Sequence, residues 1–301
     1  MNTPLRGNAP ITVGIDDSQR AIVAARWAAS AAAHRHAPLR LLHATGYTEA
    51  VAGALPPAQR LWEELQRAGA DALALAMRAV RETADVPVEE VLVDDPPARA
   101  LLKAAKDSRM VVIGGSGHPG AVKGLLVGSL ATQLSGHAEA PVAVIRGDNA
   151  DRRPEREPIV VGVDGSPLST AAIAAAFEEA ALRNAPLVAV HVWSDTDTSQ
   201  VFNRTRMMFD WEPIERSAER LLAEQLAGWG EKYPDVPVQR RIVRDRPAHA
   251  LLEEGEHAQL IVVGSRGRGG FRGLLFGSTS QNLIHHAACP VLVVRPTGEF
   301  P

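Results

Sequence analysis

The second half of this chain repeats the first. Residues 10–43 read PITVGIDDSQRAIVAARWAASAAAHRHAPLRLLH, and residues 158–191 read PIVVGVDGSPLSTAAIAAAFEEAALRNAPLVAVH, at a constant offset of 148 residues. The match continues to the endings PVAVIR at 141–146 and PVLVVR at 290–295. A period this long exceeds the roughly 20–50 residues of a solenoid repeat. The chain is therefore predicted to hold two copies of one complete domain.

A short charged segment separates the two copies. Residues 147–157 read GDNADRRPERE, with seven charged residues and one proline among the eleven. Charge runs that contain a proline are typical of solvated linkers. We therefore expect a first domain over residues 1–147, a linker over 148–157 and a second domain over 158–301.

Each copy alternates short, β-branched apolar runs with longer helical patterns. Nearly continuous apolar runs are typical of strands buried in a parallel sheet. Strands that alternate with helices through right-handed crossovers predict an α/β fold, with one doubly wound, five-stranded parallel sheet in each of two tandem domains. The expected strands are 11–15, 39–44, 88–93, 110–115 and 141–146 in the first copy, and 159–163, 187–192, 238–243, 260–264 and 290–295 in the second; helices are expected near 19–36, 58–83, 97–106 and 129–137.

Composition excludes several classes of protein. Hydrophobic residues make up 46% of the chain and charged residues 22%, which is ordinary for globular domains. The net charge of −3 gives no field that would attract nucleic acid, and no uncharged apolar run reaches the roughly 18 residues of a membrane span. The first ten residues lack the apolar stretch of a secretory signal. The single cysteine, Cys289, excludes an internal disulfide and a multi-cysteine metal site. We expect a cytoplasmic protein.

Two segments of each copy lead to the edge where ligands bind in doubly wound sheets, outside the carboxyl ends of the strands. The first contains Asp16 and, in the second copy, Asp164, directly after strand one. A carboxylate there can accept hydrogen bonds from ribose hydroxyls or from a base amine; a plain turn aspartate is the alternative. Ser18 and Ser166, two residues later, are interpreted as N-caps of the long helix that follows.

The second segment is a glycine-rich loop after strand four. In the second copy, residues 264–279 read GSRGRGGFRGLLFGST and include Arg266, Arg268 and Arg272. Glycines bring backbone amides close to an anion. A helix that begins at residues 277–278 adds unpaired amides and the positive end of the helix dipole. The loop is therefore predicted to bind an anion.

The spacing Gly264-x2-Gly267-x9-Gly277-Ser278, with the strand-one aspartate and the Pro-Val-x-Val ending, resembles the nucleotide-binding pattern of the universal stress protein family, in its ATP-binding branch. The resemblance covers both copies, and the whole chain is similar to the tandem mycobacterial type. It implies a Rossmann-like fold, ATP as the ligand with any Mg²⁺ held by the phosphates, a homodimer of tandem chains and a regulatory protein partner.

The roles that this resemblance implies fall into an adenosine group and a phosphate group, at matching positions of the two copies. The adenosine group contains the strand-one aspartate, the residue whose backbone meets adenine and the residue that lines the base: Asp16, Ala44 and Ile113 in the first copy, and Asp164, Val192 and Val263 in the second. The phosphate group contains Gly114, Gly117, Gly128, Ser129 and Leu130 in the first copy, and Gly264, Gly267, Gly277, Ser278 and Thr279 in the second.

The first copy departs from the pattern in its loop. Ten residues instead of nine separate Gly117 from Gly128, and Ser116, His118 and Lys123 replace the three arginines. A surface loop absorbs an insertion at little cost. Hydrogen bonds between charged groups and phosphate are strong, however, so their loss is costly. We therefore expect both copies to bind ATP, the second more tightly.

These features favour a regulatory protein that binds a nucleotide, and no catalytic residue is assigned. The sequence Gly115-x-Gly117-x2-Gly120 formally matches a dinucleotide fingerprint, but it follows the fourth strand instead of the first. The motifs of P-loop NTPases, α/β-hydrolases and zinc proteases are absent from the sequence. Two alternatives stay open: a slow ATPase, which needs a group that orients water, and a stress protein that acts through protein contacts and has vestigial sites.

Three further expectations concern packing. The apolar fifth strands are interpreted as sheet edges, and we expect the two copies to pair along them. The long connection 194–213 is interpreted as a lid or as an aromatic anchor for its own domain or a partner. His43 and His191, at the ends of the second strands, are interpreted as structural histidines with satisfied hydrogen bonds.

Overall fold

The computed structural model describes residues 9–47, 58–115, 129–146, 157–193, 211–267 and 276–295. The chain consists of two compact units: unit one ends at Arg152 in the continuous chain, and unit two begins at Arg153. Most of the predicted linker, 148–157, lies outside the described residues, so its bounds stay a prediction. No helix within the described ranges has the length and apolar character needed to cross a membrane.

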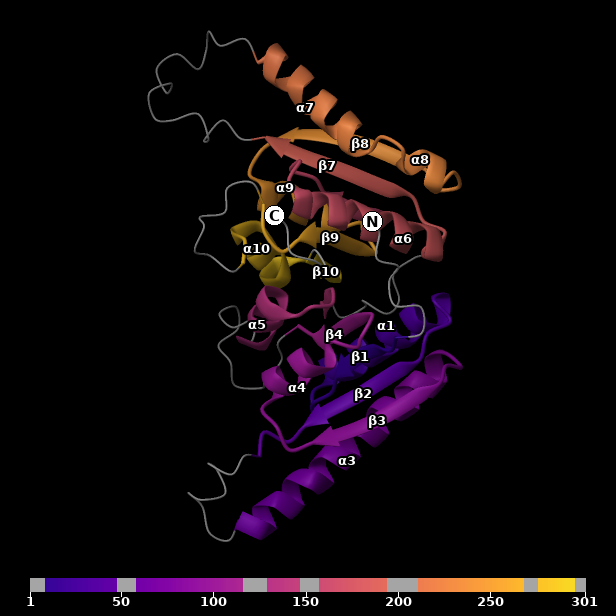
Figure 1. Cartoon of the computed structure of the whole chain (residues 1–301), viewed down its shortest axis with the longest axis vertical. Helices are drawn as coiled ribbons and strands as arrows, with labels where there is room; N and C mark the ends of the chain where they lie inside the picture. The colour runs from indigo at the N-terminus through magenta and orange to yellow at the C-terminus, as the bar shows by residue number, and fades with distance from the viewer. Residues whose placement is uncertain are drawn as a thin grey trace, which may run out of the picture. The chain divides into compact units, whose positions relative to one another are not determined.

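Unit one is a parallel sheet of five strands with helices on both faces (Figure 1). The strand order is β3-β2-β1-β4-β5, and every pairing is parallel. Helix α1 packs against α3, and α4 packs against α5. The elements are β1 (Ile11–Gly14), α1 (Gln19–His34), β2 (Leu39–Ala44), α3 (Ala58–Thr83), β3 (Val88–Val93), α4 (Pro97–Ala104), β4 (Met110–Gly114), α5 (Ser129–His137) and β5 (Val142–Ile145).

Unit two has the same topology, with the strand order β8-β7-β6-β9-β10 and all of its pairings parallel. The predicted fold class, two tandem doubly wound α/β domains, is therefore confirmed. The elements are β6 (Ile159–Gly162), α6 (Pro167–Arg183), β7 (Leu187–Trp193), α7 (Glu212–Gln225), α8 (Trp229–Lys232), β8 (Val238–Arg244), α9 (Pro247–Gly255), β9 (Leu260–Gly264), α10 (Ser278–His286) and β10 (Val291–Val294).

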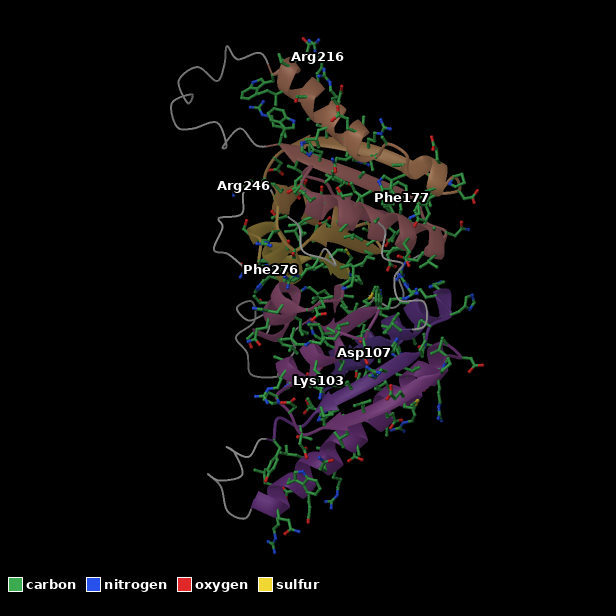
Figure 2. All side chains as sticks on the ribbon, viewed as in Figure 1. Lys103, Asp107, Phe177, Arg216, Arg246 and Phe276 are labelled. Atoms are coloured by element: carbon green, nitrogen blue, oxygen red, sulfur yellow. The ribbon has the colours of Figure 1, made fainter. Side chains whose placement is uncertain are left out.

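The core of each unit lies between the sheet and its helices. Seven of the eight buried residues of α1 are alanines, and the eighth is Trp27. Because alanine has the smallest side chain that still favours a helix, α1 can lie close to the strands it covers. In unit two, Phe177 projects from α6 (Figure 2) and stacks on Trp229 and Tyr233, with ring centroids 5.4 and 5.5 Å apart.

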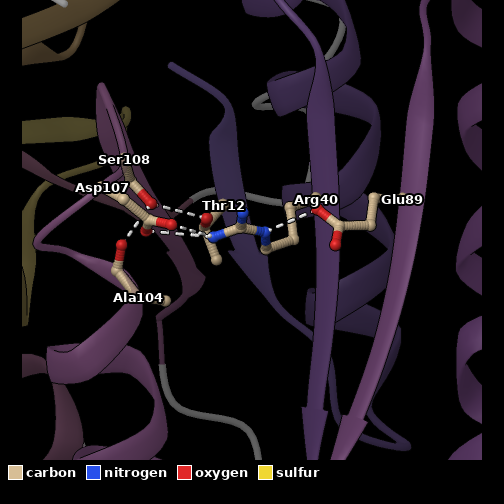
Figure 3. Close-up of polar contacts among 6 residues, drawn as sticks. All are labelled: Thr12, Arg40, Glu89, Ala104, Asp107 and Ser108. Carbon is tan, nitrogen blue, oxygen red and sulfur yellow. Dashed lines mark hydrogen bonds and ion pairs between the residues drawn. The ribbon is translucent and has the colours of Figure 1, made fainter.

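Buried polar side chains of unit one tie its first strand to the end of α4 (Figure 3). Thr12 is fully buried, and its Oγ1 lies 2.7 Å from Ser108 Oγ. Because Ser108 Oγ donates to the Ala104 carbonyl at 2.6 Å, Thr12 is the donor to Ser108. Nearby, Arg40 of β2 donates to Glu89 at 2.8 Å and to Asp107 at 3.1 Å. The Thr12 and Ser108 bonds satisfy polar groups that would otherwise be costly to bury, whereas the bonds of Arg40 reach exposed carboxylates.

The sheet order determines where a ligand could bind. In unit one, β1 lies between β2 and β4, so the winding direction reverses between β1 and β4. In unit two, the same reversal lies between β6 and β9. Parallel strands end at one edge, so the two sequence segments singled out above emerge side by side at this reversal.

Candidate functional site

Each first strand ends in a turn in which a serine donates hydrogen bonds to an aspartate. Asp164 Oδ1 accepts hydrogen bonds from the Ser166 backbone N–H (2.9 Å) and hydroxyl (2.6 Å). Asp16 Oδ1 accepts the same pair from Ser18, at 3.0 and 2.5 Å. Each serine is also the N-cap of the following helix and accepts from a backbone N–H in its first turn. The predicted N-caps are confirmed. Both aspartates form the turn of the alternative interpretation through one carboxylate oxygen, and their contact with a ligand stays a prediction.

The second carboxylate oxygen of Asp164 faces the glycine loop. A Cβ atom built on Gly267 would lie only 2.6 Å from Asp164 Oδ2, a separation that real Cβ atoms essentially never show. Gly267 is therefore needed for close approach: any side chain would have to displace the carboxylate. The fold thus brings together two residues for which the family resemblance implies contacts with different parts of a nucleotide, the adenosine and the phosphates.

The loop that contains Gly267 is attached at its base to helix α10. The Gly277 N–H donates to the Ser265 carbonyl at 2.9 Å, and Ser280 Oγ donates to the Gly264 carbonyl at 2.7 Å. Gly277 is the N-cap of α10 and has no side chain with which to cap it. The first N–H groups of a helix have no acceptor within the helix. Ser278 and Thr279 therefore present the positive end of α10 beside the loop.

The glycines that end the fourth strands have a packing role. A Cβ on Gly264 would lie 3.2 Å from Leu168 Cβ, and one on Gly114 would lie 3.0 Å from the backbone of Arg20. In both units, the first turn of the helix after strand one thus lies against the end of strand four. This contact draws the aspartate turn and the glycine loop toward each other.

The other residues predicted for the adenosine side lie at the same edge but differ in exposure. Ile113 and Val263 are 3% and 5% exposed and pack against Gly14 and Gly162 of the adjoining first strands. They form a buried floor under the edge, whereas the strand-two residues are half-buried. Contact of any of these residues with a base stays a prediction. The strand-two residues are Ala44 and Val192.

The structure describes only part of the phosphate group of the first copy. Ser129 is the exposed first residue of α5, and Leu130 follows it in the same helix. Gly117 and Gly128 lie outside the described residues, as do two of the three arginines predicted for the second loop. Their roles stay predictions.

His43 and His191 stabilise the carboxyl edge of their sheets through hydrogen bonds to the backbone. The Nδ1–H of His43 donates to the Ile15 carbonyl at 2.9 Å, and that of His191 donates to the Val163 carbonyl at 2.7 Å. Each bond joins the end of strand two to the residue that follows strand one. The interpretation of both histidines as structural is confirmed.

A tryptophan pair lies at the end of β7. The rings of Trp193 and Trp211 are 5.6 Å apart, and the Arg244 guanidinium carbon lies 4.1 Å from the centre of the Trp211 ring. Trp211 therefore packs on its own domain, as the aromatic-anchor interpretation of residues 194–213 predicted. Residues 194–210 lie outside the described part, so the lid interpretation stays untested.

The equivalent tryptophan of unit one makes a different contact. Trp62 Nε1–H donates to Asp94 Oδ2 at 2.7 Å, and this bond is the main cause that lowers the pKa of Asp94. Asp94 follows β3, whereas the arginine that meets Trp211 ends β8. Both units thus hold a tryptophan against a charged residue at the end of their third strand, but the charge has opposite signs.

The carboxyl edge of each unit carries neighbouring arginines that sequence reasoning did not connect. Burial lowers the pKa of Arg146, and the nearby charge of Arg20 lowers it further. In unit two, burial and the charge of Arg266 lower the pKa of Arg295 in the same way. Two cationic groups therefore lie near each other at the edge of each unit, beside the aspartate turn.

This combination defines a class of protein: a duplicated, doubly wound α/β protein in which an aspartate turn and a glycine loop meet at the point of strand reversal. The model of the universal stress protein family matches residues 8–146 and 155–295, and the chain belongs to this family. The family resemblance and the tandem arrangement expected from the sequence are thereby confirmed.

Relatives of known sequence and structure share the tandem organisation. A universal stress protein of Mycolicibacterium smegmatis is 41% identical over 290 residues, which cover 95% of this chain and 97% of the relative. Universal stress protein Rv2005c of Mycobacterium tuberculosis is 40% identical, with coverage of 95% and 96%. The crystal structure of a universal stress protein from Archaeoglobus fulgidus DSM 4304 covers 97% of this chain and 98% of its own, with a TM-score of 0.71 and 18% identity. With 18% identity, this structural similarity supports the fold of the chain and nothing further.

Proposed function

We propose that this protein binds an adenine nucleotide, with ATP as the preferred ligand, at the carboxyl edge of each unit, and that the bound nucleotide switches its contacts with a regulatory protein partner. The observation that carries this proposal is that the Asp164 carboxylate occupies the space where a side chain on Gly267 would lie, beside the start of α10. It joins a carboxylate acceptor to an anion-attracting loop at the position where doubly wound sheets bind ligands.

The described residues offer suitable partners for two parts of a nucleotide, its ribose and its phosphates. The turn binds Oδ1 of Asp164, and Oδ2 faces the loop. A carboxylate can accept several hydrogen bonds at once, so this side chain can serve as an acceptor for a ribose hydroxyl. The exposed Arg266 and the uncapped start of α10 offer positive charge and N–H donors to phosphate oxygens. Mg²⁺ would be carried by the phosphates, since it binds proteins through few carboxylates and usually together with substrate phosphates.

Calorimetry on the full chain tests this proposal. We expect ATP to bind with up to two sites per chain, and Gly267→Asp to remove one of them, because the new carboxylate would meet Asp164 and repel phosphate. A matched control is Gly230→Asp, since a Cβ on Gly230 meets no atom within 4 Å. Mass spectrometry of nucleotide released from the purified protein identifies the natural ligand. A folded wild-type protein that binds no adenine nucleotide overturns the proposal and favours action through protein contacts with vestigial sites.

The same preparation separates a switch ligand from a substrate. Phosphate release is followed over hours with saturating ATP and Mg²⁺, in the wild type and in Gly267→Asp. If ATP is a switch ligand, the bound ATP should stay intact, and its binding should change the hydrogen exchange of the protein's backbone amides. Turnover that Gly267→Asp abolishes would instead support the slow ATPase.

A further inference from the structure

The start of the unit-one loop is held between two arginines. Arg20 Nη1 donates to the Gly115 carbonyl at 2.7 Å. On Gly115 itself, a Cβ would lie 2.7 Å from Arg146 Cγ and 3.4 Å from Arg146 Nη1. The arginines come from the first turn of α1 and from the residue after β5. Two guanidinium groups therefore converge where β4 passes into its loop.

Unit two reaches a similar charge arrangement from a different source. Arg295 is the counterpart of Arg146, but its cationic neighbour is Arg266, which belongs to the glycine loop. The residue equivalent to Arg20 is Leu168, and the one equivalent to Arg266 is Ser116. Each unit thus has one arginine at a place where the other unit has an uncharged residue.

The backbone geometry explains how the arginine can come from helix α1 in unit one and from the glycine loop in unit two. Residues 20 and 168 occupy the same place, because Gly114 and Gly264 pack against them in the same way. A long side chain at position 20 therefore reaches the loop from α1. Arg20 is exposed, and its bond to Gly115 uses one of the five N–H donors of a guanidinium group. The remaining N–H groups and the positive charge of Arg20 are therefore suited to bind an anionic ligand at the carboxyl edge of the unit-one sheet.

We propose that Arg20 is the phosphate-positioning residue of unit one, where it supplies from helix α1 the charge that Arg266 supplies from the loop of unit two. Arg146 reinforces the positive potential at the same place. The inference rests on the proposed nucleotide binding and names the group that the polyphosphate meets in unit one. Its ligand is the phosphate chain of the nucleotide, because a guanidinium fork pairs with phosphate oxygens in two parallel hydrogen bonds.

The test isolates unit one in the full chain by means of Gly267→Asp, and then adds Arg20→Leu, which installs the residue found in unit two. ATP and adenosine are titrated separately by calorimetry. We expect Arg20→Leu to weaken ATP binding at unit one by about tenfold or more and to leave adenosine binding unchanged. Arg20→Lys keeps the charge without the fork, so its loss should be smaller. The salt dependence of ATP binding should also become shallower in Arg20→Leu.

A matched control is Arg35→Leu at the opposite end of the same helix. Arg35 Nη1 also donates to a backbone carbonyl, that of Ala31 at 3.0 Å, so this variant loses a similar bond far from the carboxyl edge. It should bind ATP like the parent. The reciprocal change, Leu168→Arg in the wild-type background, should tighten ATP binding at unit two.

Three results would overturn the inference. ATP affinity that is unchanged in Arg20→Leu shows that the side chain does not meet phosphate. Equal losses for ATP and adenosine show that it only supports the loop through Gly115. Complete loss of ATP binding in Gly267→Asp shows that unit one has no nucleotide to position. A wild-type protein that binds no nucleotide is a separate result, because it removes the proposed function itself.

Discussion

At the scale of single residues, Gly267 has the least room for a side chain among the described glycines of the candidate site, because a Cβ there would meet Asp164. We expect Gly267→Ala to weaken ATP binding at unit two by about tenfold, because the methyl group must displace a carboxylate that Ser166 holds in place, and one lost charged hydrogen bond costs about 1.5–3 kcal/mol. Calorimetry measures this effect. Gly230→Ala adds the same methyl group in open space and should leave the affinity unchanged. Equal affinities in both variants would show that the contact does not shape the site.

The site residues that the sequence points to most directly are those that recur in both copies. Asp16 and Asp164 recur with their serine, and the terminal glycines of strand four recur with the loop. Arg20 does not recur, because Leu168 occupies its place. Its contact with Gly115 also depends on α1 lying beside β4, which only the folded sheet order reveals.

The aromatic anchor was expected for Trp211, but its counterpart in unit one was missed because the chemistry of the contact changes between the copies. The tryptophans at positions 62 and 211 occur in the matching sequences LWEE and DWEP, yet one donates a hydrogen bond to Asp94 and the other stacks on Arg244. A comparison of residue types sees an acid replaced by a base and finds no shared role. The shared feature is geometric: in each unit, the start of a helix is fixed to the end of the third strand.

At the scale of elements, the buried pair Thr12 and Ser108 joins β1 to the end of α4. Ser108→Ala would leave the Thr12 hydroxyl buried without this acceptor and would remove the shorter of the two hydrogen bonds to the Ala104 carbonyl, which the Asp107 N–H still reaches at 3.3 Å, so we expect a loss of about 1–3 kcal/mol in the free energy of unfolding. Thr12→Val removes one buried donor and keeps the side-chain shape, so its cost should be nearer 1 kcal/mol. Urea denaturation of both variants measures the difference. A larger loss in Thr12→Val would contradict this account of the pair.

The start of α9 carries a contact that depends on pH. His249 Nδ1 lies 2.5 Å from Asp245 Oδ2, and this bond is the main cause that raises the pKa of His249; Glu253 raises it further, and Arg246 opposes it. The N–H of Arg246 and then His249 lower the pKa of Asp245. The contribution of His249 to stability is fully present below the ordinary histidine pKa of about 6.5 and is lost as pH rises through the folded value. That of Asp245 is present above its ordinary pKa and is lost as pH falls through its lowered value.

NMR titration of the full chain checks this prediction. The pKa of His249 should lie above about 6.5 in the wild type and return toward that value in Asp245→Asn. Glu253→Gln should produce a smaller decrease, because the Glu253 oxygen lies 3.9 Å from His249 Nε2. A wild-type pKa at or below the ordinary value would refute the contact.

The sequence predicted the strands of both units to within one or two residues, because their apolar runs are short and are bounded by glycine, proline or charge. The helices of unit two show a feature that the apolar pattern of the sequence does not predict. Where unit one has the continuous helix α3, unit two has α7 and α8, divided at Gly228 with φ +79°. Helix α8 is held by the stacking of Trp229 on Phe177, a contact between residues far apart in the sequence. Such contacts become visible only when the chain is folded.

At the scale of the whole molecule, duplication allows the two sites to diverge while the fold is kept. Both units share one strand order and one aspartate turn, but their loops and the source of their arginines differ. One copy can thus change its affinity for a ligand while the other stays constant. Pairing of the two copies along strand five and formation of a homodimer stay predictions from the sequence.

The two sites of one chain should differ in their affinity for ATP. Unit two keeps the nine-residue spacing of its loop, three arginines in or beside it and the hydroxyl pair of Ser278 and Thr279, whereas unit one has an inserted residue and Leu130. Arg20 returns one charge to unit one, so we expect unit two to bind ATP more tightly by roughly tenfold, the equivalent of a single charged contact. Calorimetry of the wild type should show two phases; Gly267→Asp should remove the tighter phase and Gly117→Asp the weaker one. The reverse assignment would show that the loop of unit one, with Arg20 behind it, is the better phosphate site.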